Sequence, residues 1–144
     1  MLIETKFFGS TEITENQIIN FPEGILGFEE YNKFAMIPVD SESPFIILQS
    51  INEKQIGFVM AYPFLFNSQY EFDVSDLDKK ELGIEKLEDV SVYSLVTLKE
   101  VFEESTMNLL SPIIINSKKN LGKQIVLNDQ EKYPLRYLLS KGGV

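Results

Sequence analysis

The sequence predicts a mainly β, antiparallel fold, either a sandwich or a barrel, with one or two short helices. Most apolar runs are short and rich in β-branched and aromatic residues, which is typical of strands rather than of core helices. The runs follow one another closely, with turn residues between them, and leave little room for the helical crossovers that parallel strands need. No repeat, low-complexity tract or linker interrupts the chain, so we expect residues 1–144 to form a single domain.

The strands are predicted from their alternating or continuous apolar patterns. In the first, Ile3, Thr5 and Phe7 alternate with Glu4 and Lys6, as in a strand with one buried and one solvated face. About eight further strands are predicted, at residues 17–21, 34–39, 45–51, 55–61, 70–74, 90–98, 108–116 and 123–127.

The clearest helix signal begins at Ser75, whose side chain can cap the first turn. Asp76 and Asp78 favour the positive end of the helix dipole, and Gly83 is expected to end the helix in the left-handed conformation. Three further segments are predicted: a second helical turn at 84–87, a hairpin with a basic tip at 117–122, and a short helix or strand at 135–140.

The residue types that are missing exclude several kinds of site. Without cysteine there is no thiolate metal site, iron–sulfur cluster or thiol nucleophile, and without histidine there is no imidazole base or haem ligand. We therefore expect no cofactor, no metal and no enzymatic activity. The longest stretch without polar side chains, residues 56–66, is much shorter than the roughly 20 residues of a membrane span. Glu4 interrupts the start, so we expect a cytoplasmic protein without a membrane partner.

The net charge of −9 is unevenly distributed along the chain. Residues 1–70 carry −6, residues 71–104 carry −7 and residues 105–144 carry +4, and Arg136 is the only arginine. This balance opposes direct binding to nucleic acid, whose phosphates favour lysine and arginine. A basic protein partner and simple solubility explain the acidity equally well.

Two pairs of neighbouring carboxylates keep an enzymatic alternative open. Glu29 with Glu30, and Glu103 with Glu104, would suit a carboxylate-dependent hydrolase if two acids converged in a pocket. Neighbours on a strand point to opposite faces, however, which favours solvated surface. The aromatic-rich residues 58–66 fit a core, a protein-docking patch or a flavin shelf, and no arginine-rich loop supports the flavin.

Two segments of the chain resemble signatures of the FliW family of flagellar assembly factors. Residues 21–29 read F-P-E-G-I-L-G-F-E and are similar to the family's F-P-x-G-(L/I)-P-G-F-E. Residues 103–116 read E-E-S-T-M-N-L-L-S-P-I-I-I-N and are similar to its T-x-N-L-x-x-P-I-x-(I/V)-N, and the strand G-K-Q-I-V-L at 122–127 resembles the one that follows. Leu26 stands where the family often has proline, and Met107 and Ser111 stand where it often has valine and alanine.

The resemblance implies a small antiparallel β-barrel-like protein in the cytoplasm of a flagellated bacterium. FliW proteins bind CsrA, an RNA-binding translational repressor, and relieve its repression of flagellin mRNA, mainly by an allosteric route. Flagellin competes for FliW, so the three proteins form a partner switch. For this chain the resemblance implies CsrA and flagellin as partners, no direct contact with nucleic acid, and a monomer when free.

The acidic segments and the family motifs together predict two binding surfaces. The predicted CsrA-binding residues are Glu71, Asp73, Asp76, Asp78, Glu103, Glu104, Asn108, Leu109, Leu110, Pro112 and Ile125. The predicted flagellin-binding residues are Phe64, Leu65 and Phe66, because amphipathic helices at the ends of flagellin need an apolar groove. Leu110 and Ile114 alternate as ordinary core residues also do, and Pro112 predicts either an edge position, open to an added strand, or a bulge.

Overall fold

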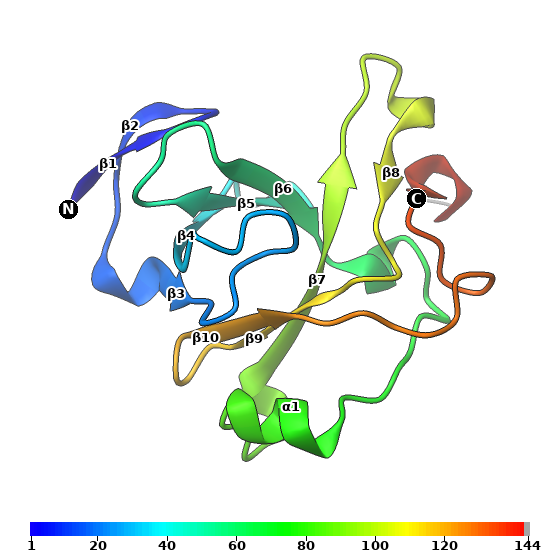
Figure 1. The fold of residues 1–144 in the computed structure, drawn as a ribbon. Helices are drawn as coiled ribbons and strands as arrows, with labels where there is room; N and C mark the ends of the chain where they lie inside the picture. Colours follow the sequence, from blue (N-terminus) through cyan, green and yellow to red (C-terminus); the bar gives the residue numbers. More distant parts are fainter. Residues whose placement is uncertain (143–144) are drawn as a thin grey trace.

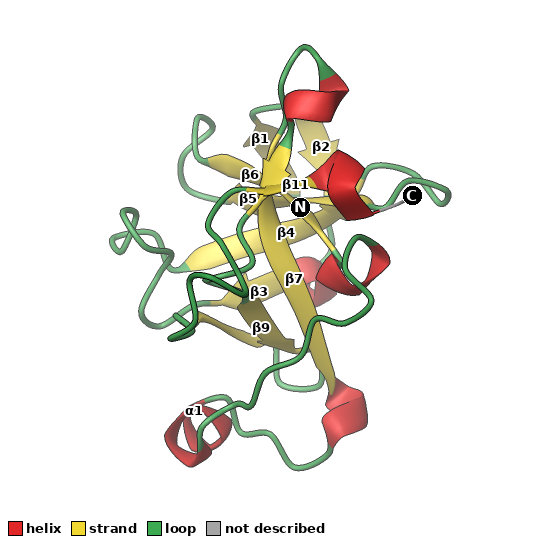
Figure 2. Ribbon diagram, turned by 90° about the vertical axis from the view of Figure 1, so that its right-hand side faces the viewer, coloured by secondary structure: helices red, strands yellow, loops and turns green. Residues whose placement is uncertain are grey.

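The computed structural model describes residues 1–142 and shows β-strands curled into a barrel with short helical turns around it (Figure 1, Figure 2). The strands are β1 (Leu2–Thr5), β2 (Gly9–Glu12), β3 (Ile18–Asn20), β4 (Lys33–Pro38), β5 (Phe45–Ser50), β6 (Gly57–Ala61), β7 (Val90–Thr97), β8 (Thr106–Met107), β9 (Ile113–Asn116), β10 (Leu121–Gln124) and β11 (Tyr137–Leu138). The helical elements are the α-helix α1 (Asp76–Glu81) and the 3-10 turns η1 (Glu15–Gln17), η2 (Pro63–Leu65), η3 (Leu87–Asp89), η4 (Phe102–Glu104) and η5 (Leu139–Gly142). No helix within residues 1–142 is long and apolar enough to span a bilayer.

Seven strands close the barrel in the order β7, β6, β5, β4, β3, β10, β9, because β9 pairs back onto β7. The pairs are antiparallel except β3 with β10, which is parallel and meets at Asn20 and Leu121. The main core cluster includes Phe21 and Phe34, whose rings meet edge to face with centroids 5.5 Å apart. The mainly β, barrel-like fold with one short α-helix is therefore confirmed.

Strand β7 has two successive partners, and a bulge separates them. Residues 90–93 pair with β9 and close the barrel, whereas residues 96 and 97 pair with β8, which carries β11 on its other side. Between the two pairings, Ser94 and Leu95 lie opposite residues 108–112, so the chain from β8 to β9 must bulge outward. Pro112 ends this bulge just before β9, where its missing N–H costs no ladder hydrogen bond.

Most of the predicted strands are confirmed, with shifted ends. The patterns at 17–21, 34–39, 45–51, 55–61, 90–98 and 123–127 correspond to β3, β4, β5, β6, β7 and β10. The predicted strand at 70–74 is wrong. In that segment the Tyr70 and Phe72 rings pack together at 5.3 Å, and the Glu71 N–H donates to the Tyr133 hydroxyl, so the backbone joins no strand.

The predicted strand at 108–116 is correct only for its second half, β9. Because β9 has β10 on one side and β7 on the other, the predicted edge position is wrong and the bulge is confirmed. The structure also adds two short strands, β2 and β8, whose sequences carry little apolar pattern. Strand β2 pairs with β1 in a hairpin that lies outside the barrel. Ile3 of β1 packs against Ala35 and Ile47 of the barrel.

The predicted helix is confirmed as α1. The Ser75 hydroxyl accepts a hydrogen bond from the Asp78 N–H at 3.1 Å, and Gly83 beyond the helix has a φ of +63°. The predicted helical turn at 84–87 is wrong, since the next turn, η3, begins only at Leu87. The segment 135–140 becomes β11 and the start of η5, and β9 and β10 form the predicted hairpin.

Candidate functional site

The bulge at residues 108–112, which lies within the second family-like segment, is held by its own polar groups. The Asn108 Oδ1 accepts a hydrogen bond from the Ser111 N–H at 2.9 Å, which closes the turn. The Tyr70 hydroxyl, buried beside it, donates to the Leu109 carbonyl at 2.6 Å. Burial raises the pKa of Tyr70 above its ordinary value, which favours the protonated hydroxyl that donates this bond.

The same bulge extends strand β10 beyond its last ladder pair. The Ile125 N–H donates to the Pro112 carbonyl at 3.0 Å, and the Leu127 N–H donates to the Leu110 carbonyl at 2.8 Å. Alternate residues of an extended chain direct their backbone groups to the same side. Residues 125 and 127 therefore hold the chain against the bulge, and the backbone groups of the residues between them face away.

The turn at residues 21–29, the first family-like segment, depends on two glycines. Gly24 has a φ of +69°, and a Cβ added there would lie 2.6 Å from the Glu29 Cα. Gly27 has a φ of +88°, and its N–H donates to the Glu29 carboxylate at 3.0 Å. That hydrogen bond lowers the pKa of the Glu29 carboxyl. The shift is opposite to the one a catalytic acid in a hydrolase needs.

Gln124 joins the two family-like segments through one side chain. Its Oε1 accepts from the Leu26 N–H at 2.9 Å, and its Nε2 donates to the Ser111 carbonyl at 3.1 Å. A proline in place of Leu26 would have no N–H to donate to this hydrogen bond. The leucine of this chain therefore adds a hydrogen bond between the turn and the barrel.

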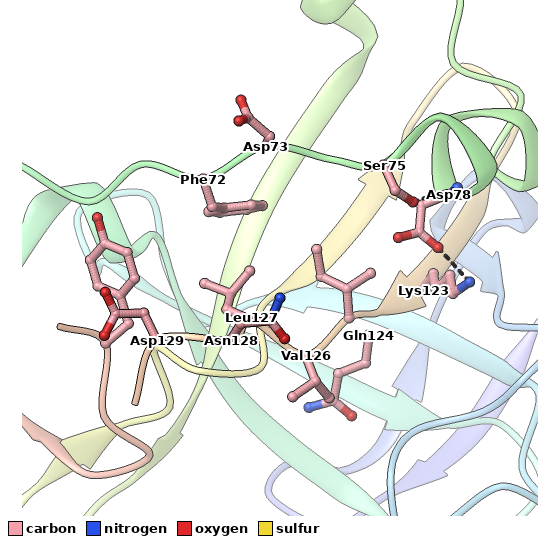
Figure 3. Close-up of a pocket in the computed structure, with 12 residues that line it drawn as sticks. Phe72, Asp73, Ser75, Asp78, Lys123, Gln124, Val126, Leu127, Asn128 and Asp129 are labelled. Atoms are coloured by element: carbon pink, nitrogen blue, oxygen red, sulfur yellow. Dashed lines mark hydrogen bonds and ion pairs between the residues drawn. The ribbon is translucent and has the colours of Figure 1, made fainter. Parts of the chain in front are cut away.

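An open groove of about 520 Å³ lies between the extended end of β10 and the segment that leads into α1. Figure 3 shows Phe72 and Asp73 on one wall and Leu127, Asn128 and Asp129 on the other. The complete set of lining residues is Phe72, Asp73, Ser75, Asp78, all seven residues 123–129, and Tyr133. The groove thus combines apolar side chains with carboxylates on both walls, and we treat it as the candidate site.

Lys123 connects the end of the groove to α1 and to the first family-like turn. Its Nζ lies 2.6 Å from Asp78, 2.5 Å from Glu81 and 3.2 Å from Glu23. The Lys123 and Asp78 side chains are only 17% and 18% exposed, whereas both glutamates are much more exposed. The hydrogen bond to Lys123 lowers the pKa of Asp78, and the same bond, with that to Glu81, raises the pKa of Lys123.

The remaining carboxylates of the groove have no comparable partner. Among the described side chains, no lysine or arginine lies within 4 Å of Glu71, Asp73 or Asp129. Lys132 borders Glu71 and Asp73 in an adjoining hollow without forming an ion pair. The groove is lined by three aspartates and one lysine, so its lining carries a net negative charge.

The predicted acidic cluster is divided by the fold. Asp73 and Asp78 line the groove, and Glu71 and Asp76 lie on the same segment and on the first turn of α1. Residues 103 and 104 belong to η4, which precedes β8 at the top of Figure 1, whereas α1 lies at the bottom. Figure 2 shows the same separation. Four of the six predicted carboxylates therefore lie on residues 71–78, two of them in the groove, and the other two lie at the far end.

Most of the predicted motif residues of the partner groove are buried. Leu109 and Leu110 are 0% and 4% exposed, and Pro112 and Ile125 are buried as well. Asn108 is half-buried and directs its Oδ1 into the bulge. These side chains shape the bulge and the wall of the groove, so the interpretation of Leu110 and its neighbours as core residues fits the structure.

The three predicted flagellin-binding residues do not share one surface. Phe64 and Leu65 in η2 are 43% and 52% exposed, but Phe66 is 4% exposed and stacks on Phe45. The Phe64 ring lies 5.8 Å from Tyr70, which in turn contacts the groove residues Phe72 and Tyr133. The exposed part of this predicted site is thus connected to the candidate groove through Tyr70.

Nine of the twelve groove residues were not among the predicted site residues: Phe72, Ser75, Lys123, Gln124, Val126, Leu127, Asn128, Asp129 and Tyr133. Lys123 and Gln124 stand in the strand that resembles the family's, and this was the available signal for them. Asp129 follows the strand, two residues before Glu131, and no local pattern marks it as a site residue. Only the pairing of residues 125 and 127 with the bulge places it opposite Asp73.

The two predicted carboxylate pairs lie apart from the candidate groove. Within residues 1–142, no group of three or more Asp, Glu, His or Cys side chains is placed to hold a metal ion. Glu29 and Glu30 are exposed on the first turn, and Glu103 and Glu104 are exposed on η4. Neither pair lines the candidate groove.

Comparisons with known proteins agree with the resemblance of the two segments. The sequence profile of the family described as "FliW protein" matches residues 2–139. A flagellar assembly factor FliW from Exiguobacterium sp. strain AT1b is 49% identical over 139 residues, which cover 96% of this chain and 94% of the relative. The Bacillus subtilis strain 168 protein of the same name is 42% identical over 138 residues, covering 94% of this chain and 96% of the relative.

A solved structure gives the same result at the level of the fold. The crystal structure of a flagellar assembly factor FliW superposes with a TM-score of 0.89 at 40% identity, covering 96% of each chain. These relatives are named as flagellar assembly factors and not as enzymes. The match extends over the barrel, the bulge and the groove, and the chain therefore belongs to the FliW family of flagellar assembly factors.

Proposed function

We propose that this chain binds the translational repressor CsrA and relieves its repression of flagellin mRNA, and that flagellin competes with CsrA for it. The observation that carries the proposal is the groove, which Asp73 and Asp129 line from opposite walls, neither in an ion pair with a lysine or arginine among the described side chains, beside the apolar side chains of Phe72 and Leu127. Membership of the FliW family supports a role in flagellar assembly. The protein would act by binding, in the cytoplasm, as a monomeric single-domain unit.

The charge of the groove suits CsrA because RNA-binding proteins are basic where they hold phosphate. Unpaired carboxylates attract such a partner and raise the association rate more than the final affinity. If the chain weakens RNA binding by CsrA, RNA must weaken its binding to CsrA by the same factor. A coupling of about 1–3 kcal/mol changes either affinity roughly 5- to 150-fold, enough for a regulatory switch.

The proposed competition with flagellin has a structural basis in the position of Phe64 and Leu65. Both side chains are exposed, as an apolar contact for an amphipathic helix requires. Phe64 reaches the groove through Tyr70, whose ring lies 4.7 Å from Tyr133. A flagellin helix on Phe64 and Leu65 would therefore occupy the surface next to the proposed CsrA groove, and the two partners would exclude each other.

The first test measures CsrA binding to a variant that carries Asp73→Lys and Asp129→Lys. We expect association with CsrA to slow by about tenfold at low salt and to lose most of its salt dependence. A matched control carries Glu15→Lys and Glu42→Lys, which change the net charge equally at exposed acids outside the groove. Equal association rates for the two variants would refute the groove as the CsrA surface.

The second test mixes the protein with CsrA and flagellin, separately and together. We expect each partner to bind alone and flagellin to displace CsrA in stopped-flow or calorimetric titrations. The change of Phe64 and Leu65 to alanine should weaken flagellin binding with little effect on folding, because both side chains are exposed. A ternary complex in which neither partner weakens the other would refute the switch.

A further inference from the structure

The extended end of β10 leaves a row of backbone hydrogen-bonding groups without partners. Val126 and Asn128 make no hydrogen bond through their N–H or C=O to any other of residues 1–142. The intervening Leu127 and the preceding Ile125 are both bonded to the bulge. Val126 is also 57% exposed, so the residue at the centre of this row lies at the surface.

The open edge borders the candidate groove along its whole length. All residues from 123 to 129 line the groove, and in Figure 3 the side chains of Val126 and Leu127 point to opposite sides of the chain. This alternation is the geometry of a β-strand. Residues 125–128 therefore offer a short edge about 13 Å long, at roughly 3.3 Å per residue, which ends where the chain bends at Asn128.

The charges beside the edge specify the kind of chain that would pair with it. Asp73 lies on one wall of the groove and Asp129 lies beyond one end of the edge. At the other end, Lys123 already forms ion pairs with three carboxylates. A strand laid along the edge would place every second side chain in the groove, against Phe72 and these carboxylates. Long basic side chains fit both surfaces, because their stems pack on apolar groups while their charges reach the acids.

We propose that the edge at residues 125–128 accepts an added β-strand from a protein partner, an extended segment with lysine or arginine at alternate positions. The backbone of Val126 and Asn128 would supply the hydrogen bonds, and Asp73 and Asp129 would select the basic side chains. The inference deepens the proposed function, since it states how a basic partner docks in the groove. It differs from the sequence prediction of an edge at Pro112, which the pairing of β9 on both sides excludes.

Hydrogen exchange in the complex with CsrA tests the strand addition directly. We expect the Val126 and Asn128 amides to exchange at least about tenfold more slowly when CsrA is bound, the effect of one added hydrogen bond each. The Ile125 and Leu127 amides, already bonded to the bulge, serve as internal controls and should change little. A complex that forms but leaves the Val126 and Asn128 amides unprotected would overturn the strand addition and leave the proposed function standing.

A substitution gives a second measurement. Val126→Pro removes the free N–H and is expected to weaken CsrA binding by about tenfold, whereas Val126→Ala keeps the N–H and should change it less than about threefold. If the proline variant does not fold, as judged by circular dichroism, the exchange experiment on the unchanged protein decides. Equal affinity of folded Val126→Pro and Val126→Ala would overturn the strand addition. A chain that does not bind CsrA at all would refute the proposed function and this inference together.

Discussion

The ion pairs of Lys123 predict a measurable loss of stability in Lys123→Met. The methionine keeps the length and apolar stem of the side chain but leaves Asp78, Glu81 and Glu23 without their shared cation. The interaction with Asp78 dominates, because both side chains are mostly buried and the Nζ to Oδ1 distance is 2.6 Å. The perturbation therefore tests whether this lysine holds α1 on the barrel.

The size of the expected stability loss depends on how exposed each carboxylate partner of Lys123 is. A hydrogen bond between charged groups contributes about 1.5–3 kcal/mol. The Glu81 and Glu23 side chains are 42% and 65% exposed, so each adds no more than about 0.5 kcal/mol. Asp78 regains some water once the lysine is gone, which favours the lower end of the range. We expect Lys123→Met to lower the free energy of unfolding by about 2 kcal/mol, or roughly 6–8 °C in Tm for a chain of this size.

Urea unfolding followed by circular dichroism measures this loss, and Lys119→Met is the matched control. Lys119 makes one exposed ion pair, at 3.3 Å from Glu85, and its replacement should cost at most about 0.5 kcal/mol. Hydrogen exchange should show that the amides of α1 lose protection first in Lys123→Met. If the two variants were equally stable, Lys123 would not hold α1, and the assignment of its ion pairs as the link between helix and barrel would be refuted.

Three further predictions concern the barrel and its pH dependence. Gly122→Ala should lose about 1–3 kcal/mol in urea unfolding, because the new Cβ would lie 2.5 Å from the Cζ of the fully buried Phe21; stability equal to the unchanged chain would contradict this packing. The pKa of Asp78 is lowered from 3.8, so its contribution should be present above about pH 4 and be lost as pH falls through the folded-state value. Unfolding measured from pH 2 to 6 should therefore be less pH-dependent in Asp78→Asn, and parallel curves would contradict the shift. Ser94→Ala should be neutral or stabilising by up to about 1 kcal/mol, since the buried Oγ has no hydrogen-bond partner within residues 1–142; a loss above that size in the same assay would show that the hydroxyl is satisfied.

Local sequence patterns were sufficient where an element is defined by its own residues. The alternation and β-branching of β4, β5, β6 and β7 predict strands because each strand has a continuous run of apolar residues. The Ser75 cap and the left-handed Gly83 predict the ends of α1 for the same reason. The predictions that proved wrong concern segments whose structure depends on contacts distant in sequence. Residues 70–74 have the composition of a strand, yet Tyr70 and Phe72 pack with side chains instead of pairing their backbone.

In the candidate site, too, some features could be predicted from local sequence and others depend on tertiary contacts. Asp73 and Asp78 were predicted as parts of an acidic surface, and both line the groove. Sequence could not place Asp129 opposite them, because the placement depends on the hydrogen bonds of residues 125 and 127 to the bulge. It also could not separate residues 103 and 104 from α1 or show that Phe66 turns inward while Phe64 stays exposed. These features depend on which way a chain turns after an element ends.

The sequence by itself determined the strand-rich character of the chain, the absence of thiol and imidazole chemistry, its acidity and, through two segments, its family. Tertiary structure alone decided how the barrel closes, through β7 with β9 and the parallel contact of β3 with β10. It also decided which carboxylates share a surface and which edge remains open. The physical reason is that composition and periodicity act within a few residues, whereas closure and the groove arise from hydrogen bonds and packing between segments far apart in the chain.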